Sequence, residues 1–204
     1  MDLKVRRASI KKFLAELVQH CIKNDVAFNL RNEKNIFVEG LPCSGYFEGG
    51  EEKGELVVAV DKPQKQWLPI LVHESCHLDQ WLEDKEKFIS YDGLEVVDQW
   101  LNGKRATKKK LTSAIEASKK LELDCEIRSV AKIKKYKLPI DITTYIQMAN
   151  SYIYFYNWVL ENRRWLEKGQ TLYLKEIYEV CPTEFQSNYK KTPKAINDAF
   201  NEFI

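Results

Sequence analysis

Two histidines and a glutamate on one predicted helix are the residues best suited to chemistry in this sequence. His73-Glu74-Ser75-Cys76-His77 has the pattern HExxH. In a helix of 3.6 residues per turn, positions four apart lie one above the other, so the two imidazoles can hold one divalent cation. This spacing is typical of zinc-binding histidines, with the glutamate as the general base that deprotonates a metal-activated water. We therefore expect Zn2+ at His73 and His77, and Glu74 as the catalytic base.

The alternative is a chance match on an ordinary amphipathic helix. The chain has 3 histidines, however, and two of them fall in this motif. Apolar and small residues also recur at three- and four-residue spacing on the other side of the helix. They are Leu68, Leu71, Val72, Ser75, Leu78 and Leu82. We expect this side to be buried while His73 and His77 face a cleft.

A second helix carries two carboxylates on one face. Ser113 and Glu116 form a capping-box pattern, and Glu122 and Glu126 follow at helical spacing among small and apolar residues. A buried carboxylate is costly unless it binds a cation or accepts a hydrogen bond, for example from a ligating histidine. The alternative is a surface-facing pair bonded to nearby lysines, Lys119 or Lys120. We favour the metal site for these glutamates.

The spacing of apolar and turn-forming residues predicts an α+β, mostly helical chain with a small antiparallel sheet. The element that carries HExxH follows Pro63, with Pro69 expected in its first turn. The expected strands cover residues 27–30, 35–38, 45–47 and 55–60. The other expected helices cover residues 9–23, 94–101, 113–136 and 141–168, with two short helices within 172–180 and 193–203.

Length and composition predict one domain over residues 1–204, with a core over 26–136 and a helical part over 137–204. The net charge of +2 does not indicate a nucleic acid as partner. The 5 cysteines never form a CxxC pair, which indicates reduced thiols, and without a visible export signal we expect a cytoplasmic protein. The uncharged stretch 142–160 contains polar residues, so we expect a buried helix and no membrane span.

Three other groups of residues are weaker candidates. His20, near the end of the first predicted helix, is expected to be solvated rather than a ligand. A basic loop has no interleaved aromatic residue and is expected to be solvated as well; it contains Lys104, Arg105, Lys108, Lys109 and Lys110. Three tyrosines share a stripe of the helix over 141–168 and are expected in the core; they are Tyr145, Tyr152 and Tyr156.

HExxH followed by Glu122-Leu123-Asp124-Cys125-Glu126 resembles the gluzincin-like zinc peptidases, particularly the compact intracellular ImmA/IrrE group. In that group HExxH is followed by a helix with an ExxAD-like pattern, where this chain has Cys125 and Glu126 in place of Ala and Asp. The resemblance covers residues 55–136 and implies a zincin-like domain with zinc as cofactor and a protein or peptide as substrate. It also implies Glu122 as the third zinc ligand and Glu126 as an acid that supports a ligating histidine.

The sequence thus predicts a zinc metallopeptidase that hydrolyses peptide bonds. The competing interpretation is a non-catalytic, metal-stabilised module that regulates or binds a partner protein. An open coordination position beside Glu74 favours the enzyme, whereas a further ligand such as Cys76 or Asp79 favours the module.

Overall fold

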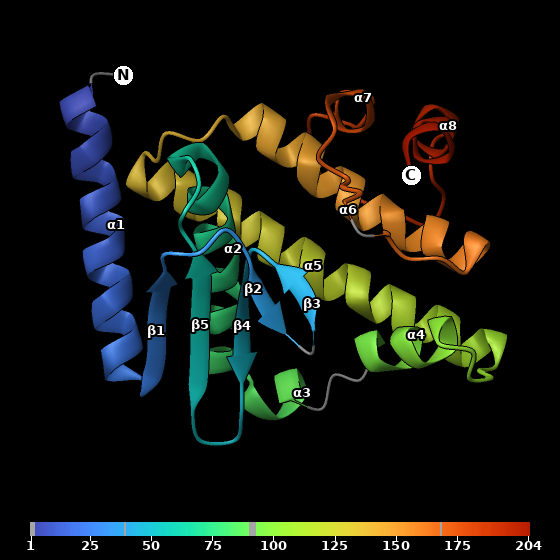
Figure 1. Cartoon of the computed structure of the whole chain (residues 1–204), viewed down its shortest axis with the longest axis horizontal. Helices are drawn as coiled ribbons and strands as arrows, with labels where there is room; N and C mark the ends of the chain where they lie inside the picture. The colour runs from blue at the N-terminus through green and yellow to red at the C-terminus, as the bar shows by residue number, and fades with distance from the viewer. Residues whose placement is uncertain (1–2, 39, 90–92, 168) are drawn as a thin grey trace. The chain divides into compact units, whose positions relative to one another are not determined.

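The structure is a computed structural model that describes residues 3–38, 40–89, 93–167 and 169–204 (Figure 1). It divides the chain into two compact units. Unit 1 comprises residues 1–90 and 128–140, and unit 2 comprises residues 91–127 and 141–204. The long helix α5 (Lys108–Tyr136) contributes its first part to unit 2 and its last part to unit 1.

The described chain is α+β and mostly helical, as predicted. Unit 1 contains α1 (Leu3–Lys23), β1 (Val26–Arg31), β2 (Ile36–Val38), β3 (Leu41–Cys43), β4 (Gly45–Gly49), β5 (Gly54–Ala59), α2 (Gln64–Glu83) and α3 (Lys85–Ile89). Unit 2 contains α4 (Gly93–Leu101), α6 (Ile142–Asn162), α7 (Lys175–Tyr178) and α8 (Lys194–Phe203).

The main sheet has the strand order β1-β5-β4 and is mixed rather than antiparallel (Figure 1). β1 runs parallel to β5, whereas β4 runs antiparallel to β5, and β2 and β3 form a separate antiparallel pair. The predicted antiparallel sheet is therefore wrong in part. Residue alternation identifies strands but does not encode their relative direction, and the segment between β1 and β5 is long enough for a crossover. Leu56, Val57, Val58 and Ala59 of β5 are fully buried, as expected for a central strand.

Helix α2 packs against β4 and β5, and its buried side is the predicted one. Leu68, Leu71, Val72, Ser75 and Leu78 are buried, whereas Leu82 is half-buried. Trp81, also buried, lies so close to β4 that a Cβ on Gly49 would come within 2.4 Å of its ring. Any larger residue at position 49 would clash with the Trp81 ring, so glycine allows β4 and α2 to pack closely together.

The start of α2 differs from the prediction. The helix begins at Gln64 after Pro63, so Pro69 lies in the second turn instead of the first. Proline has no backbone N–H, so the carbonyl of Lys65 loses its usual helical hydrogen bond. This cost falls before the motif, and the helix continues through His73 and His77.

Unit 2 is built around the aromatic helix α6. Phe155, Tyr156 and Trp158 are buried, and α6 contacts both α7 and α8. The carboxylate of Asp141 accepts a hydrogen bond of 2.7 Å from the Thr144 backbone N–H, which confirms the predicted start of the helix. The helix ends at Asn162, before the predicted end at Lys168, which lies outside the described residues.

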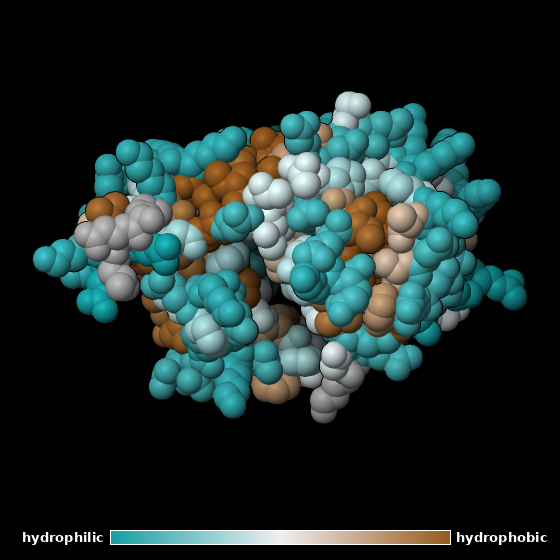
Figure 2. Space-filling model, turned by 90° about the horizontal axis from the view of Figure 1, so that it is seen from above, coloured by the Kyte–Doolittle hydropathy of each residue, from teal (hydrophilic) through white to brown (hydrophobic). Residues whose placement is uncertain are grey.

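The first part of α5 begins earlier than the predicted capping box. The Thr107 hydroxyl accepts a hydrogen bond of 3.2 Å from the Lys110 backbone N–H, so Ser113 lies inside the helix. The surface seen in Figure 2 is largely hydrophilic. Among the described residues, no helix combines the length and apolar character that a membrane crossing requires.

Candidate metal centre

The two motif histidines face each other on α2. Their Nε2 atoms are 3.1 Å apart, and the ring planes are inclined by 85°. Both rings are half-buried, in contrast to the fully buried opposite side of the helix. Four residues of helix place the rings one turn apart, and the Nε2 atoms converge on one point in space. This is the arrangement that the HExxH spacing predicted.

Gln80 completes this group, and the sequence reasoning missed it. Its side-chain oxygen lies 2.8 Å from His77 Nδ1, and the residue is buried with 8% of its surface exposed. Because Gln80 follows His77 by three positions, it lies on the same side of α2. Metal-binding histidines usually donate their second ring N–H to a nearby acceptor. A hydrogen-bond acceptor three residues after the second histidine of HExxH could therefore have predicted this contact from the sequence.

The expected general base, Glu74, is half-buried near the end of β3. Burial raises the pKa of the Cys43 thiol, and the Glu74 carboxylate raises it further. At the next residue, the Ser44 hydroxyl accepts a hydrogen bond of 3.0 Å from the Lys62 ammonium. Burial lowers the pKa of Lys62. Glu74 is therefore close enough to Cys43 for the two groups to interact electrostatically.

Aromatic rings border His77 on its C-terminal side. The Phe88 ring of α3 lies 6.3 Å from the His77 ring and 5.9 Å from the Phe47 ring of β4, measured between centroids. Phe47 in turn lies 5.7 Å from Trp81, whose indole N–H donates to the Gly50 carbonyl. These contacts limit the access of water to one side of the histidine pair.

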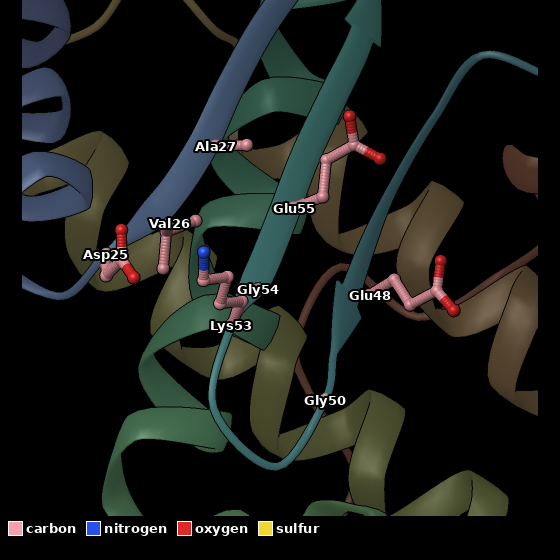
Figure 3. Close-up of a pocket in the computed structure, with 8 residues that line it drawn as sticks. All are labelled: Asp25, Val26, Ala27, Glu48, Gly50, Lys53, Gly54 and Glu55. Carbon is pink, nitrogen blue, oxygen red and sulfur yellow. The ribbon is translucent and has the colours of Figure 1, made fainter.

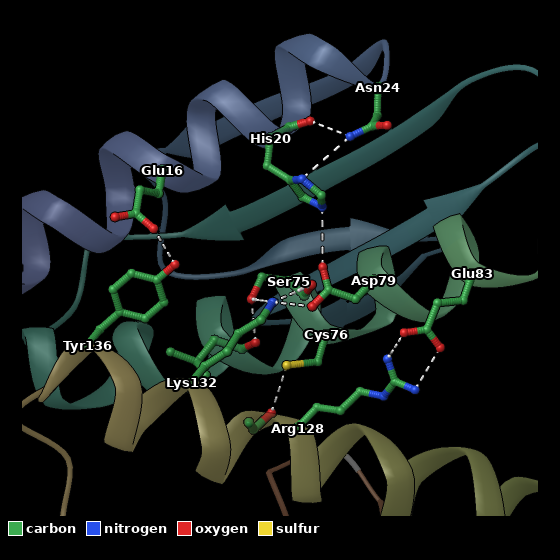
Figure 4. A network of polar contacts seen from close by, with 12 residues as sticks. Glu16, His20, Asn24, Ser75, Cys76, Asp79, Glu83, Arg128, Lys132 and Tyr136 are labelled. Atoms are coloured by element: carbon green, nitrogen blue, oxygen red, sulfur yellow. Dashed lines mark hydrogen bonds and ion pairs between the residues drawn. The ribbon is translucent and has the colours of Figure 1, made fainter.

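A polar network links α2 to α1 and to the last part of α5 (Figure 4). The Lys132 ammonium donates to the Ser75 carbonyl at 2.8 Å and contacts Asp79 Oδ2 at 2.8 Å. His20 Nε2 lies 3.3 Å from Asp79 Oδ1, so His20 contacts an acid of α2 and does not join the histidine pair. The Ser129 hydroxyl contacts the Cys76 sulfur at 3.4 Å. Asp79 and Cys76 of α2 thus each have a polar partner on α1 or α5.

In unit 2, the two predicted glutamates of α5 are buried, each with 6% of its surface exposed. Glu126 accepts a hydrogen bond of 2.5 Å from the Tyr145 hydroxyl of α6. The hydroxyls of Tyr152 and Tyr156 are 3.1 Å apart. Burial raises the pKa of Tyr152 well above its ordinary value, and electrostatic interactions with Tyr156 and Glu122 raise it further. The predicted tyrosine stripe thus faces the predicted carboxylates. Lys119, the proposed surface partner, bonds Glu116, Asn157 and Tyr189.

A surface pocket of about 520 Å³ lies at one end of the main sheet (Figure 3). It is lined by Asp25, Val26, Ala27, Glu48, Gly50, Lys53, Gly54 and Glu55. The Glu55 carboxylate already accepts hydrogen bonds from Asn29 and the Tyr46 hydroxyl. No residue of the HExxH motif lines this pocket, so it is separate from the candidate metal centre.

The structure therefore brings His73 and His77 together on α2, and Glu74 belongs to the same helix. Glu122 and Glu126 share a face of α5 in the other unit, and their relation to the histidines stays a prediction. Comparison of the chain with known protein families, with curated proteins and with solved structures finds no match. The function is thus inferred from the chemistry of the described residues.

Proposed function

We propose that the chain is a zinc-dependent peptidase in which His73 and His77 bind the metal and Glu74 is the general base. The supporting observation is the 3.1 Å separation of the two Nε2 atoms. Zinc binds imidazole nitrogens at about 2.0–2.1 Å in tetrahedral geometry, which places two such nitrogens about 3.3–3.4 Å apart. The histidines thus need to separate by only a few tenths of an ångström to fit zinc.

The donor set also fits zinc as a catalytic rather than a closed structural metal. Asp79 is held by Lys132 and by His20, and Cys76 contacts the Ser129 hydroxyl of α5. A catalytic zinc keeps one position open for water or substrate, whereas a structural zinc has four protein ligands. This arrangement favours the enzyme over a metal-stabilised binding module.

We propose Glu122 as the third ligand and Glu126 as a supporting acid. Both are buried, but Glu126 already accepts the Tyr145 hydroxyl, which suits a supporting role. Cys125, which lies on the same face of α5 and is fully buried, offers a thiolate as the competing third donor. The last part of α5, which belongs to unit 1, contacts α2 through Lys132 and Ser129.

In this proposal the protein residues divide the chemistry between them. Zinc, when bound, supplies a Lewis acid that polarises a peptide carbonyl and acidifies water. Glu74 accepts the proton of the attacking water and passes it to the leaving amine. Glu74 is half-buried, and its charge is felt by the Cys43 thiol, whose pKa it raises. A zincin-like fold and a cytoplasmic location, which agrees with 5 free cysteines, belong to the same proposal.

The proposal is tested with two variants. Protein purified without chelator should contain about one zinc per chain by elemental analysis, and His77→Ala should lose it because a ligand is removed. Glu74→Gln should keep the fold and the zinc but lose hydrolysis, because the amide cannot accept the proton of water.

Activity is best measured on many substrates at once. Wild type and Glu74→Gln are incubated in parallel with cellular proteins, and new N-termini are compared by mass spectrometry. New N-termini in the wild-type sample alone support the peptidase. Identical patterns together with bound zinc would instead identify a non-catalytic, metal-stabilised module.

A further inference from the structure

We propose that Gln80 is a positioning residue that keeps the proton of His77 on Nδ1 and so leaves Nε2 as the metal-binding lone pair. The role of this tautomer in metal binding rests on the proposed zinc site. The predicted tautomer, however, belongs to the metal-free protein and can be measured there.

The contact is short and sheltered. The Gln80 side-chain oxygen lies 2.8 Å from His77 Nδ1, and 8% of the Gln80 surface is exposed. A carbonyl oxygen only accepts hydrogen bonds, so Nδ1 must carry the proton. In a neutral imidazole the other nitrogen then has the lone pair, since the hydrogen bond made by one ring nitrogen sets the state of the other. Nε2 of His77 is therefore an acceptor before any metal arrives.

The tautomer of His77 determines the tautomer of His73 in the metal-free protein. The two Nε2 atoms are 3.1 Å apart, a hydrogen-bonding distance. In this contact His77 Nε2, with its lone pair, is the acceptor, so His73 is expected to donate a proton from its own Nε2. The two histidines are thus predicted to be different tautomers, His77 with Nδ1–H and His73 with Nε2–H. A divalent cation between the rings takes the place of this single proton.

An amide differs from a carboxylate at this position in a measurable way. A carboxylate that accepts from a ligating histidine raises its basicity as a ligand, whereas a neutral carbonyl orients the ring with less effect on its charge. Gln80→Glu should therefore keep the Nδ1–H tautomer and bind zinc at least as tightly as wild type. Gln80→Leu, an apolar replacement in a buried position, removes the hydrogen-bond acceptor. His77 should then no longer be restricted to the Nδ1–H tautomer.

The first measurement is the tautomer of each histidine in metal-free protein, from long-range ¹H–¹⁵N correlation spectra. The chain has 3 histidines, so His20→Asn and the motif variants suffice for assignment. Spectra are recorded at about pH 8, above the ordinary histidine pKa of about 6.5. We expect Nδ1–H for His77 in wild type and Gln80→Glu, and Nε2–H or a mixture in Gln80→Leu. An Nε2–H form of His77 in wild type overturns the proposal, since the Gln80 amide would then present its NH₂ group.

The second measurement is zinc affinity, from competition with a chromophoric chelator. Gln80→Leu should weaken zinc binding by about 10-fold to 100-fold, as expected when the acceptor behind a ligating histidine is lost. Gln66→Leu is the matched control, because it makes the same change at an exposed position of the same helix. Unchanged affinity in Gln80→Leu overturns the positioning role. Failure of the wild type to bind zinc overturns the proposed function instead, while the tautomer result still decides whether Gln80 sets the state of His77.

Discussion

The hydrogen bond from Tyr145 to Glu126 gives a quantitative test of the role assigned to Glu126. The Tyr145 hydroxyl lies 2.5 Å from Glu126 Oε2, and the two residues are 9% and 6% exposed. A hydrogen bond to a charged group contributes about 1.5–3 kcal/mol to stability. Tyr145→Phe keeps the ring and removes only the donor, so the free energy of unfolding of metal-free protein should fall by this amount. For a chain of this size, 1 kcal/mol shifts the midpoint by about 2–4 °C, so Tm should drop by about 3–12 °C.

A double-mutant cycle shows whether this loss belongs to the pair. In a Glu126→Gln background the acceptor is neutral, and Tyr145→Phe should cost only about 0.5–1.5 kcal/mol. Urea denaturation of the four proteins, purified with chelator, gives the four free energies. Equal losses in both backgrounds would refute the charged hydrogen bond. If Tyr145→Phe instead left stability unchanged and abolished zinc binding, Glu126 would be the ligand and the proposed roles of Glu122 and Glu126 would be exchanged.

Three further predictions concern the carboxylates and the buried lysine. Glu122→Ala should weaken zinc binding more than Glu126→Ala, whose effect should be about 10-fold to 100-fold, as chelator competition can rank. Lys119→Met should lower the free energy of unfolding by about 1–3 kcal/mol in urea titrations, because Lys119 is 4% exposed and its loss removes the donor to the Asn157 side-chain oxygen, whereas the Tyr189 carbonyl still accepts from the Asn157 amide. Hydrogen bonds from Thr144 lower the pKa of Asp141 in the folded protein, so the Asp141 carboxylate stabilises the fold at pH values above its unfolded pKa. As pH falls through the lowered pKa, wild type should lose this stability. Urea titrations of wild type and Asp141→Asn at several pH values measure the difference.

The sequence predicted those features that depend on residue spacing along a single element. Apolar spacing located β5 and the buried side of α2, and the end of α5 at Tyr136 was confirmed. The capping residue Asp141 was also predicted correctly, because its side chain acts on the helix that follows directly. Local rules suffice for these features, since each is decided by residues within one or two turns.

Other features depend on partners that lie far apart in the chain. The direction of β1 relative to β5 is set by the path of the connecting segment, which alternation does not encode. The contact between Tyr145 and Glu126 joins two helices, and the spacing within each helix indicates only which face is apolar. Gln80 is different, because it lies one turn from His77 and was missed for its neutral side chain, which suggests no chemistry until the histidine contact is seen.

The two sides of α2 have separate tasks, and this separation makes site variants interpretable. The side opposite to the histidines carries the buried apolar residues and the contacts of Ser75 and Asp79 with Lys132. Substitutions at His73, His77 or Gln80 change none of these contacts, so the helix should stay in place when a donor is removed. Loss of zinc in such a variant can then be assigned to the donor itself, provided that the unfolding midpoint of the metal-free protein is unchanged. A shared loss of zinc and of metal-free stability would show that the histidine side also supports the fold.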